Sequence, residues 1–342
     1  MKPHDFRYAF ALFALVNIFL LSSCDVEFSP NAQWKEVPVV YCLLDQDDSI
    51  SYVRVEKCYL SEGDIYAPAR ISDSVNYPQG SIDVSILAFD SLGGLRDSLP
   101  FVYAEIDHDE GDFAYTAQPI YYCVTAGRLR DDWRYQLRVR HTDDNRVIAS
   151  TPSIPLIKQV SQAVVNKPSY TEFNGRPSGQ FAFNSAGNTC LIEWDTMRFG
   201  RLYQPVIRFY YSVNGDTTYV DLHSAPSKAS RGTANTISVS YNREAFLKEL
   251  KTKLHDDTAT KKYLKMVDIY LTVASDDYNA YRTSLQAGAS LSQGREPYTN
   301  INGGLGVFAS RRTHLYKWMP SDSSNLANGL YTHLRNLGVG IE

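Results

Sequence analysis

The residues that could do chemistry are spread along the chain without the spacings that catalytic or metal sites require. The acidic run Glu105–Asp112 alternates carboxylates as a calcium loop does. It lacks the D-x-[DN]-x-[DN]-G pattern with a later Glu, so a solvated hairpin tip is the better interpretation. The seven histidines form no HxxxH or HExxH pair, and neither a C-x-x-C pair nor a G-x-S-x-G elbow occurs. The sequence therefore predicts no catalytic residues, no metal ion and no cofactor.

A glycine-rich turn, Gly304-Leu305-Gly306, resembles part of a dinucleotide-binding loop. Such a loop must open a helix, whereas this turn leads into an expected strand, so a phosphate site is not supported. Glycine adopts backbone conformations that other residues avoid, and we expect that freedom to explain its presence here. The longer segment Asn300–Phe308 is accordingly expected to be structural and to order the C-terminal unit.

The elements that would position any site begin after an export signal. Lys2 and Arg7 precede an apolar run, Tyr8–Leu21, which is shorter than the roughly 20 residues that span a bilayer. The run ends in Leu21-Ser22-Ser23-Cys24, which has the form of a bacterial lipobox. The alternative is an ordinary cleaved signal that happens to precede a cysteine. We favour the lipobox because the cysteine position, the length of the apolar run and the two small residues agree.

The lipobox predicts how the chain is anchored. We expect residues 1–23 to be a lipoprotein signal peptide, Cys24 to carry acyl chains such as palmitate, and residues 24–36 to form a lipidated tether. Two or three acyl chains hold a protein stably at a membrane where one does not. Asp25 and Glu27 follow the cysteine and resemble a surface-export signal, so both the periplasmic and the outer face of the outer membrane stay open.

Composition favours a folded, β-rich body. The chain is 44% hydrophobic and 21% charged, as expected of a globular protein, and its net charge of -4 offers no basic footprint for nucleic acid. Aromatic residues make up 13%, including 24 tyrosines, and aromatic residues favour strands. We expect a mostly β fold. An Ig-like or transthyretin-like β-sandwich over 37–156 would be followed by a second β-sandwich-like domain with a few short helices over 157–342.

Local patterns place the strands of the first unit. Residues 37–44 and 51–60 flank an acidic turn at Asp45–Asp48, and Gly93-Gly94 marks a second hairpin. In the segment Trp133–Arg140, apolar and polar residues alternate, so one face is expected in the core and the other in solvent. Pro152 and Pro155 cannot continue a central strand, which places the end of this unit near 156.

The second unit carries turn and cap signals of its own. Asn214-Gly215 predicts a type I′ hairpin turn. Asn242 is expected to cap a helix that buries one face, and Asp276 to cap a second, shorter helix. Strands are expected over 263–274 and 305–317, and a final helical pattern over 326–334. The residues expected on the buried face of the first helix are Phe246, Leu250 and Leu254.

The mature chain keeps four cysteines, and an oxidising compartment would allow them to pair. Four cysteines have three full pairings, and the sequence does not choose among them. Small, buried, unpaired thiols are the preferred alternative. The residues concerned are Cys42, Cys58, Cys123 and Cys190.

Three tyrosines in expected loops are the candidates for ligand binding: Tyr66, Tyr77 and Tyr298. An exposed tyrosine can stack on a sugar or anchor a protein partner. We also expect the long loops 63–79 and 224–235 to contact a partner.

Several of these features occur together in a known type of protein. Cys24 in its lipobox, Trp194 on an expected strand, and the segment Asn300-Ile301-Asn302-Gly303-Gly304-Leu305-Gly306-Val307-Phe308 follow in that order. This arrangement resembles a domain-of-unknown-function family of Bacteroidota lipoproteins, commonly encoded beside TonB-dependent outer-membrane receptors. The resemblance brings no catalytic residues. It implies an outer-membrane lipoprotein that is accessory to such a receptor or to another barrel complex.

We therefore expect a non-enzymatic, lipid-anchored binding or accessory protein at the outer membrane or cell surface. A glycan-binding surface lipoprotein is the first alternative, and an adhesin or fimbrial subunit is the second. A hydrolase is a further alternative, because paired catalytic carboxylates leave little trace in a sequence.

Overall fold

A computed structural model describes residues 35–59, 70–107, 117–158, 164–165, 170–173, 176–181, 183, 189–229, 236–254, 261–288 and 297–320. From Glu36 onward the described residues belong to one compact unit. They are 58% strand and 13% helix, which confirms the predicted mostly β class with sandwich-like units and few helices. The predicted signal peptide, the tether up to residue 34 and the helical pattern at 326–334 lie outside the described residues.

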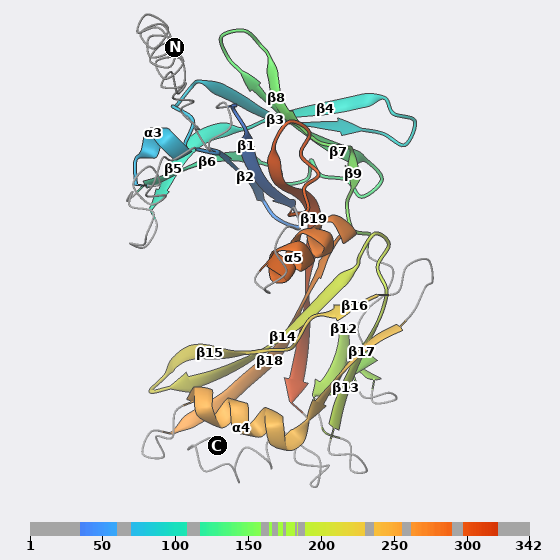
Figure 1. Cartoon of the computed structure of the whole chain (residues 1–342). Helices are drawn as coiled ribbons and strands as arrows, with labels where there is room; N and C mark the ends of the chain where they lie inside the picture. The colour runs from blue at the N-terminus through green and yellow to red at the C-terminus, as the bar shows by residue number, and fades with distance from the viewer. Residues whose placement is uncertain are drawn as a thin grey trace, which may run out of the picture. The chain divides into compact units, whose positions relative to one another are not determined.

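The elements follow the chain in two groups (Figure 1). The first group is β1 (Pro38–Leu44), β2 (Ile50–Lys57), α3 (Ser72–Val75), β3 (Ile82–Phe89), β4 (Leu95–Pro100), β5 (Val102–Asp107), β6 (Ala117–Val124), β7 (Arg134–His141), β8 (Val147–Ser150) and β9 (Ile154–Pro155). The second group is β10 (Val164–Val165), β11 (Tyr170–Phe173), β12 (Arg176–Phe181), β13 (Thr189–Asp195), β14 (Leu202–Val213), β15 (Asp216–His223), β16 (Ser227–Lys228), β17 (Thr236–Asn242), α4 (Arg243–Leu254), β18 (Lys262–Ala274), α5 (Asp276–Gly288) and β19 (Leu305–Pro320).

The first group forms a sandwich around one hydrophobic core. The sheet segment β19-β1-β2-β6-β5 contributes one layer, and the sheet β4-β3-β7-β8 contributes the other. Alternation on β7 is as predicted, because Tyr135, Leu137 and Val139 are buried and Trp133 packs against the same core. The predicted hairpin turn at Asp45–Asp48 joins β1 to β2, which pair antiparallel.

The second group surrounds a separate core between the sheet segment β15-β14-β18-β19 and the smaller sheet β10-β13-β17. The predicted turn between β14 and β15 has Asn214 at φ 52° and Gly215 at φ 96°, the positive values that a type I′ turn needs. The amide oxygen of Asn242 accepts hydrogen bonds from the backbone N–H groups of Glu244 (3.0 Å) and Ala245 (3.2 Å), so it caps α4 as predicted. The helix buries the expected face of Phe246, Leu250 and Leu254.

Strand β19 belongs to both groups (Figure 1). Its first residues pair parallel to β1, and the residues from Arg311 onward pair antiparallel to β18. Ile301 and Phe308 consequently lie in the first core, although the predicted boundary at 156–157 assigns them to the second unit. That boundary separates the rest of the two cores, but the chain returns to the first one near its C-terminus.

The acidic turn at Asp45–Asp48 fixes the point where β19 changes partner. The buried carboxylate of Asp45 accepts a hydrogen bond from the backbone N–H of Thr313 at 3.0 Å. Arg311 Nη2 lies 3.1 Å from Asp48 Oδ2, and Arg312 Nε lies 2.8 Å from Asp47 Oδ2. These contacts connect a hairpin of the first group to the strand that enters the second.

The glycine-rich turn packs directly on β1. Gly306 pairs with Val40 and has φ +107°, and a Cβ at this position would overlap the Val40 carbonyl oxygen. A Cβ at Gly304 would similarly overlap the Pro38 carbonyl oxygen. The expected unusual backbone conformation is present at Gly306, whereas at Gly304 the close approach of β1 excludes a side chain. The expectation that Asn300–Phe308 orders the C-terminal unit was wrong, because Ile301 and Phe308 pack in the first core.

We predict that Gly306→Ala destabilises the fold by more than about 4 kcal/mol, because a backbone clash adds to an unfavourable φ. Gly80→Ala is the matched control, since Gly80 also has a positive φ (+79°) but a Cβ there would meet nothing within 4 Å. That control should lose only about 1–2 kcal/mol. Thermal unfolding followed by circular dichroism measures both, and equal losses would contradict the close approach to β1.

Candidate functional site

The structure describes two of the three sequence-predicted ligand tyrosines, Tyr77 and Tyr298. Tyr66 and the lipidation residue Cys24 lie outside the described residues. Placing Tyr77 in an exposed loop was wrong, because Tyr77 is buried in the first core. The preceding residues form the helical turn α3, and Asn76 then bridges to Glu56 of β2, which turns the next ring inward. A large ring gains free energy from that burial.

Tyr298 makes local structural contacts. Its hydroxyl donates a hydrogen bond to Asp277 at 2.6 Å, and its backbone N–H donates to the Ser284 hydroxyl at 3.0 Å. Burial and the neighbouring carboxylates raise the pKa of Tyr298. These contacts join the segment before β19 to α5, so the residue is half-buried rather than freely available to a ligand.

The four cysteines of the described body were candidates for disulfide pairing. None of them forms a disulfide: Cys42, Cys123 and Cys190 are buried, and Cys58 is half-buried. Burial raises the pKa of the Cys58 thiol, so the neutral form is favoured there. The structure therefore agrees with the preferred alternative, in which these cysteines stay outside disulfides.

A cluster of tyrosines around Arg208 lies on β14, β15 and β18. The Arg208 guanidinium pairs with Asp221 through two hydrogen bonds of 2.7 and 2.8 Å. It also lies over the rings of Tyr219 and Tyr270, at 3.9 and 4.7 Å from their centroids. The Tyr270 hydroxyl is 3.2 Å from that of Tyr210. The Arg208 guanidinium thus already occupies the ring faces turned toward it, and the cluster links three neighbouring strands.

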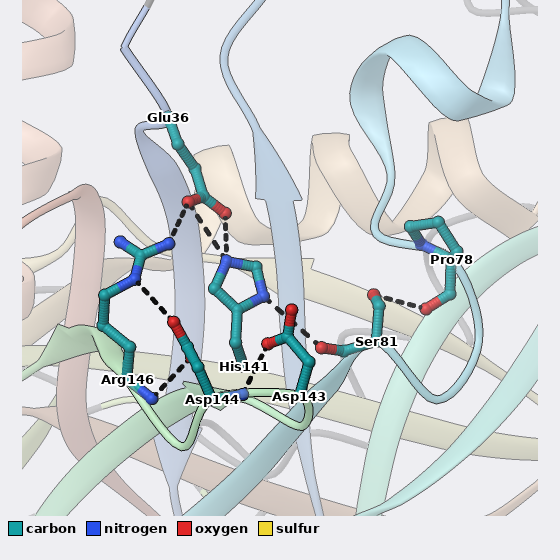
Figure 2. Close-up of polar contacts among 7 residues, drawn as sticks. All are labelled: Glu36, Pro78, Ser81, His141, Asp143, Asp144 and Arg146. Carbon is teal, nitrogen blue, oxygen red and sulfur yellow. Dashed lines mark hydrogen bonds and ion pairs between the residues drawn. The ribbon is translucent and has the colours of Figure 1, made fainter.

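The polar cluster nearest the predicted tether consists of Glu36, His141 and Arg146, which we call the tether-root cluster (Figure 2). The Glu36 carboxylate lies 2.9 Å from His141 Nε2 and 3.2 Å from Arg146 Nη2. Glu36 lies two residues before the start of β1, whereas the two basic residues flank the turn between β7 and β8. The chain is therefore held to the first sandwich at the residue where the predicted tether ends.

Local chemistry positions the basic side chains. Asn145 adopts a positive φ of 58° in the β7–β8 turn, a conformation that asparagine tolerates. Asp144 accepts a hydrogen bond from the Arg146 backbone N–H at 2.8 Å and pairs with its guanidinium at 3.4 Å (Figure 2). On the other side of the imidazole, His141 Nδ1 is 3.4 Å from the Ser81 carbonyl oxygen. Both basic groups are thereby aimed at Glu36.

Charge stabilises the cluster. The hydrogen bond to Glu36 raises the pKa of His141, although burial alone would lower it. Burial alone would raise the pKa of Glu36, but the hydrogen bonds and charge of His141 and Arg146 lower it overall. The carboxylate and the imidazolium therefore favour each other's charged forms.

Serine, histidine and glutamate meet here, but not as a catalytic triad. A triad needs the serine hydroxyl on one imidazole nitrogen and the carboxylate on the other. His141 Nδ1 faces the backbone oxygen of Ser81, and the Ser81 hydroxyl donates to the Pro78 carbonyl at 2.7 Å (Figure 2). The hydroxyl is thus committed elsewhere, and the cluster is suited to holding the chain rather than to nucleophilic attack.

Sequence reasoning did not find this cluster, because its partners are far apart in the chain and each looks like an ordinary turn or terminal residue.

No family model and no curated protein matches the sequence. Within the described ranges, no three His, Cys, Asp or Glu side chains are grouped to hold a metal, and no helix is long and apolar enough to cross a membrane.

We predict that the tether-root cluster stabilises the fold by about 0.5–1 kcal/mol in a defined pH window. The Glu36 contribution is present above pH 4.5 and is lost as the pH falls through its lowered pKa. The His141 contribution is present below pH 6.5 and is lost as the pH rises through its raised pKa. The stability difference between the wild type and His141→Gln should therefore be largest between those values.

Denaturant unfolding at a series of pH values measures that difference. His223→Gln is the control, because His223 is an exposed histidine at the end of β15. A difference between wild type and His141→Gln that is the same at all pH values would show that the ion pair contributes nothing.

Proposed function

We propose that the protein is a lipid-anchored accessory protein of the outer membrane that acts by binding and not by catalysis. The observation that carries this proposal is the tether-root cluster. Glu36 is the last residue of the segment expected to form the lipidated tether, and its ion pairs to His141 and Arg146 hold that end of the segment on a sandwich. A rigid body held at one point on a short tether is suited to presenting a surface to neighbours in the membrane.

The arrangement of the polar groups supports binding over catalysis. Where Ser81, His141 and Glu36 meet, the serine hydroxyl is directed to the Pro78 carbonyl oxygen. Binding at a membrane also demands little affinity, because a lipid anchor raises the effective concentration of the protein near other membrane components. A modest interface is then sufficient.

The proposed partner is a TonB-dependent receptor or another outer-membrane barrel complex. The support for this choice is the resemblance to lipoproteins encoded beside such receptors, carried by the lipobox at Cys24 and the segment Asn300–Phe308. The proposal holds for either face of the outer membrane, because a tether can present the body to a barrel from the periplasm or from the exterior.

We predict that Cys24→Ser releases the protein from the membrane fraction or leaves it as an uncleaved precursor, because the serine hydroxyl does not replace the thiol that receives the lipid. Cys58→Ser is the matched control and should stay in the outer-membrane fraction, since Cys58 is a half-buried thiol of the folded body. Fractionation combined with labelling by a fatty-acid analogue measures both. Label that persists on the Cys24→Ser protein would refute anchoring at this residue.

A further inference from the structure

The first sandwich has an unusual outer surface on β2, β6 and β5. Alternate residues of β2 and β6 are buried in the core, and Tyr103 of β5 packs against it, so residues on the opposite side should be polar where they face water. Instead, the outward positions include Tyr52 (49% exposed), Val124 (58%), Val102 (57%) and Ile106 (42%). We call these four residues, together with Tyr122, the outer face.

Strand register shows that the members of the outer face are neighbours. Tyr52 of β2 pairs with Tyr122 of β6, and Tyr122 pairs with Val102 of β5, which gives a continuous row across three strands. Val124 lies two residues along β6 on the same side of the sheet, and Ile106 lies further along β5 on that side. Contiguous exposed apolar side chains of this kind mark interaction sites.

On the same side of the sheet, the neighbouring strands β1 and β19 are covered by α5. The ring of Tyr41 on β1 packs edge-on against Tyr281 of α5, with 5.9 Å between the ring centroids. Tyr41 pairs with Arg54 of β2, so this covered part and the outer face belong to one surface. The helix therefore shields the part over β1 and β19, and the four exposures above show that the part over β2, β6 and β5 is open to solvent.

A hollow adjoins the outer face. It has a volume of about 310 Å³ and is lined by residues that include Val39, Arg54, Glu56, Lys57 and Val75. Arg54 is two residues from Tyr52 on the same side of β2 and pairs with Glu56. Aromatic and aliphatic anchors beside a polar-edged hollow are the features on which protein interfaces concentrate their binding energy.

The chemistry of the surface selects among possible occupants. A membrane surface is recognised by several basic residues, whereas here Arg54 is already neutralised by Glu56. A polysaccharide needs hydrogen-bonding groups between the aromatic rings, whereas Val102, Val124 and Ile106 offer none. A protein that presents apolar side chains, with one side chain or carbonyl group directed to the hollow at Arg54, matches both parts of the surface.

We propose that the outer face, with its hollow, is the docking surface for a membrane protein. This inference rests on the proposed anchoring, because a tether from Cys24 to Glu36 extends at most about 40 Å and confines β1 to the layer next to the membrane. The partner is therefore a protein embedded in that membrane. The sheet presents its tyrosines rigidly, so little conformational entropy is lost when the partner binds.

Photocrosslinking in intact membranes tests the proposal. The full chain carries p-benzoylphenylalanine in place of Tyr52, or in place of Tyr219 as a control with the same 49% exposure on the second group of strands. We expect position 52 to give one major product, identified by mass spectrometry as a membrane-embedded protein, and position 219 not to give it. A product that contains only a second copy of this chain, only lipid or only polysaccharide would overturn the proposal.

A paired substitution tests the energetics of the same surface. Tyr52→Ser combined with Val124→Lys should reduce recovery of the partner with the purified protein by about tenfold or more. Both side chains are exposed, so the thermal midpoint should stay close to that of the wild type. The control combines Tyr219→Ser with Val147→Lys, since Val147 of β8 is also 49% exposed. Equal recovery from the two variants would refute the docking surface.

The outcome also separates this inference from the proposed function. If Cys24→Ser stays lipidated but the outer-face variant still loses the partner, the docking surface stands and the anchoring proposal falls. If the anchor is confirmed but the partner is recovered regardless of Tyr52 and Val124, the anchoring stands and the docking surface falls.

Discussion

The parallel contact between β1 and the start of β19 is the constraint on which the rest of the structure depends. It requires the backbone of Gly304 and Gly306 to lie directly on the carbonyl groups of Pro38 and Val40, with no room for a side chain. The side chain of Asn300 closes the same turn, because it accepts a hydrogen bond from the Phe308 N–H at 2.9 Å and donates one to the Phe308 carbonyl at 2.7 Å. This contact gives both hydrophobic cores a common strand.

Strand β1 is in turn the element that connects the surfaces for which we propose a function. Glu36 and its ion pairs stand at its start, and the acidic turn that holds Arg311 and Arg312 stands at its end. The sheet side that carries Tyr41 continues across β2 into the outer face. A pull on the proposed tether would therefore be applied next to β1, which pairs with the strand that joins the two cores.

Features set by neighbouring residues could be predicted from the sequence. The Asn214-Gly215 turn, the Asn242 cap and the alternation on β7 each depend on a few consecutive residues, and all three are present. Burial of Tyr77 was missed because a loop-like composition does not reveal which way the chain turns. The pairing of β19 with β1 and the contact of Glu36 with His141 join residues more than a hundred positions apart, and no local pattern encodes such contacts.

The return of the chain to its first core has a consequence for how the protein acquires its structure. In a chain that is made from its N-terminus, β1 to β9 are present well before Ile301 and Phe308, so the N-terminal sandwich lacks two of its core side chains and one strand of its sheet until the residues of β19 follow. The unpaired edge of β1 is exposed throughout that interval. Contacts of such high sequence separation slow folding, and an open strand edge invites aggregation. In the folded protein the edge of β1 is closed by its pairing with β19, so the first sandwich is complete only when that pairing forms.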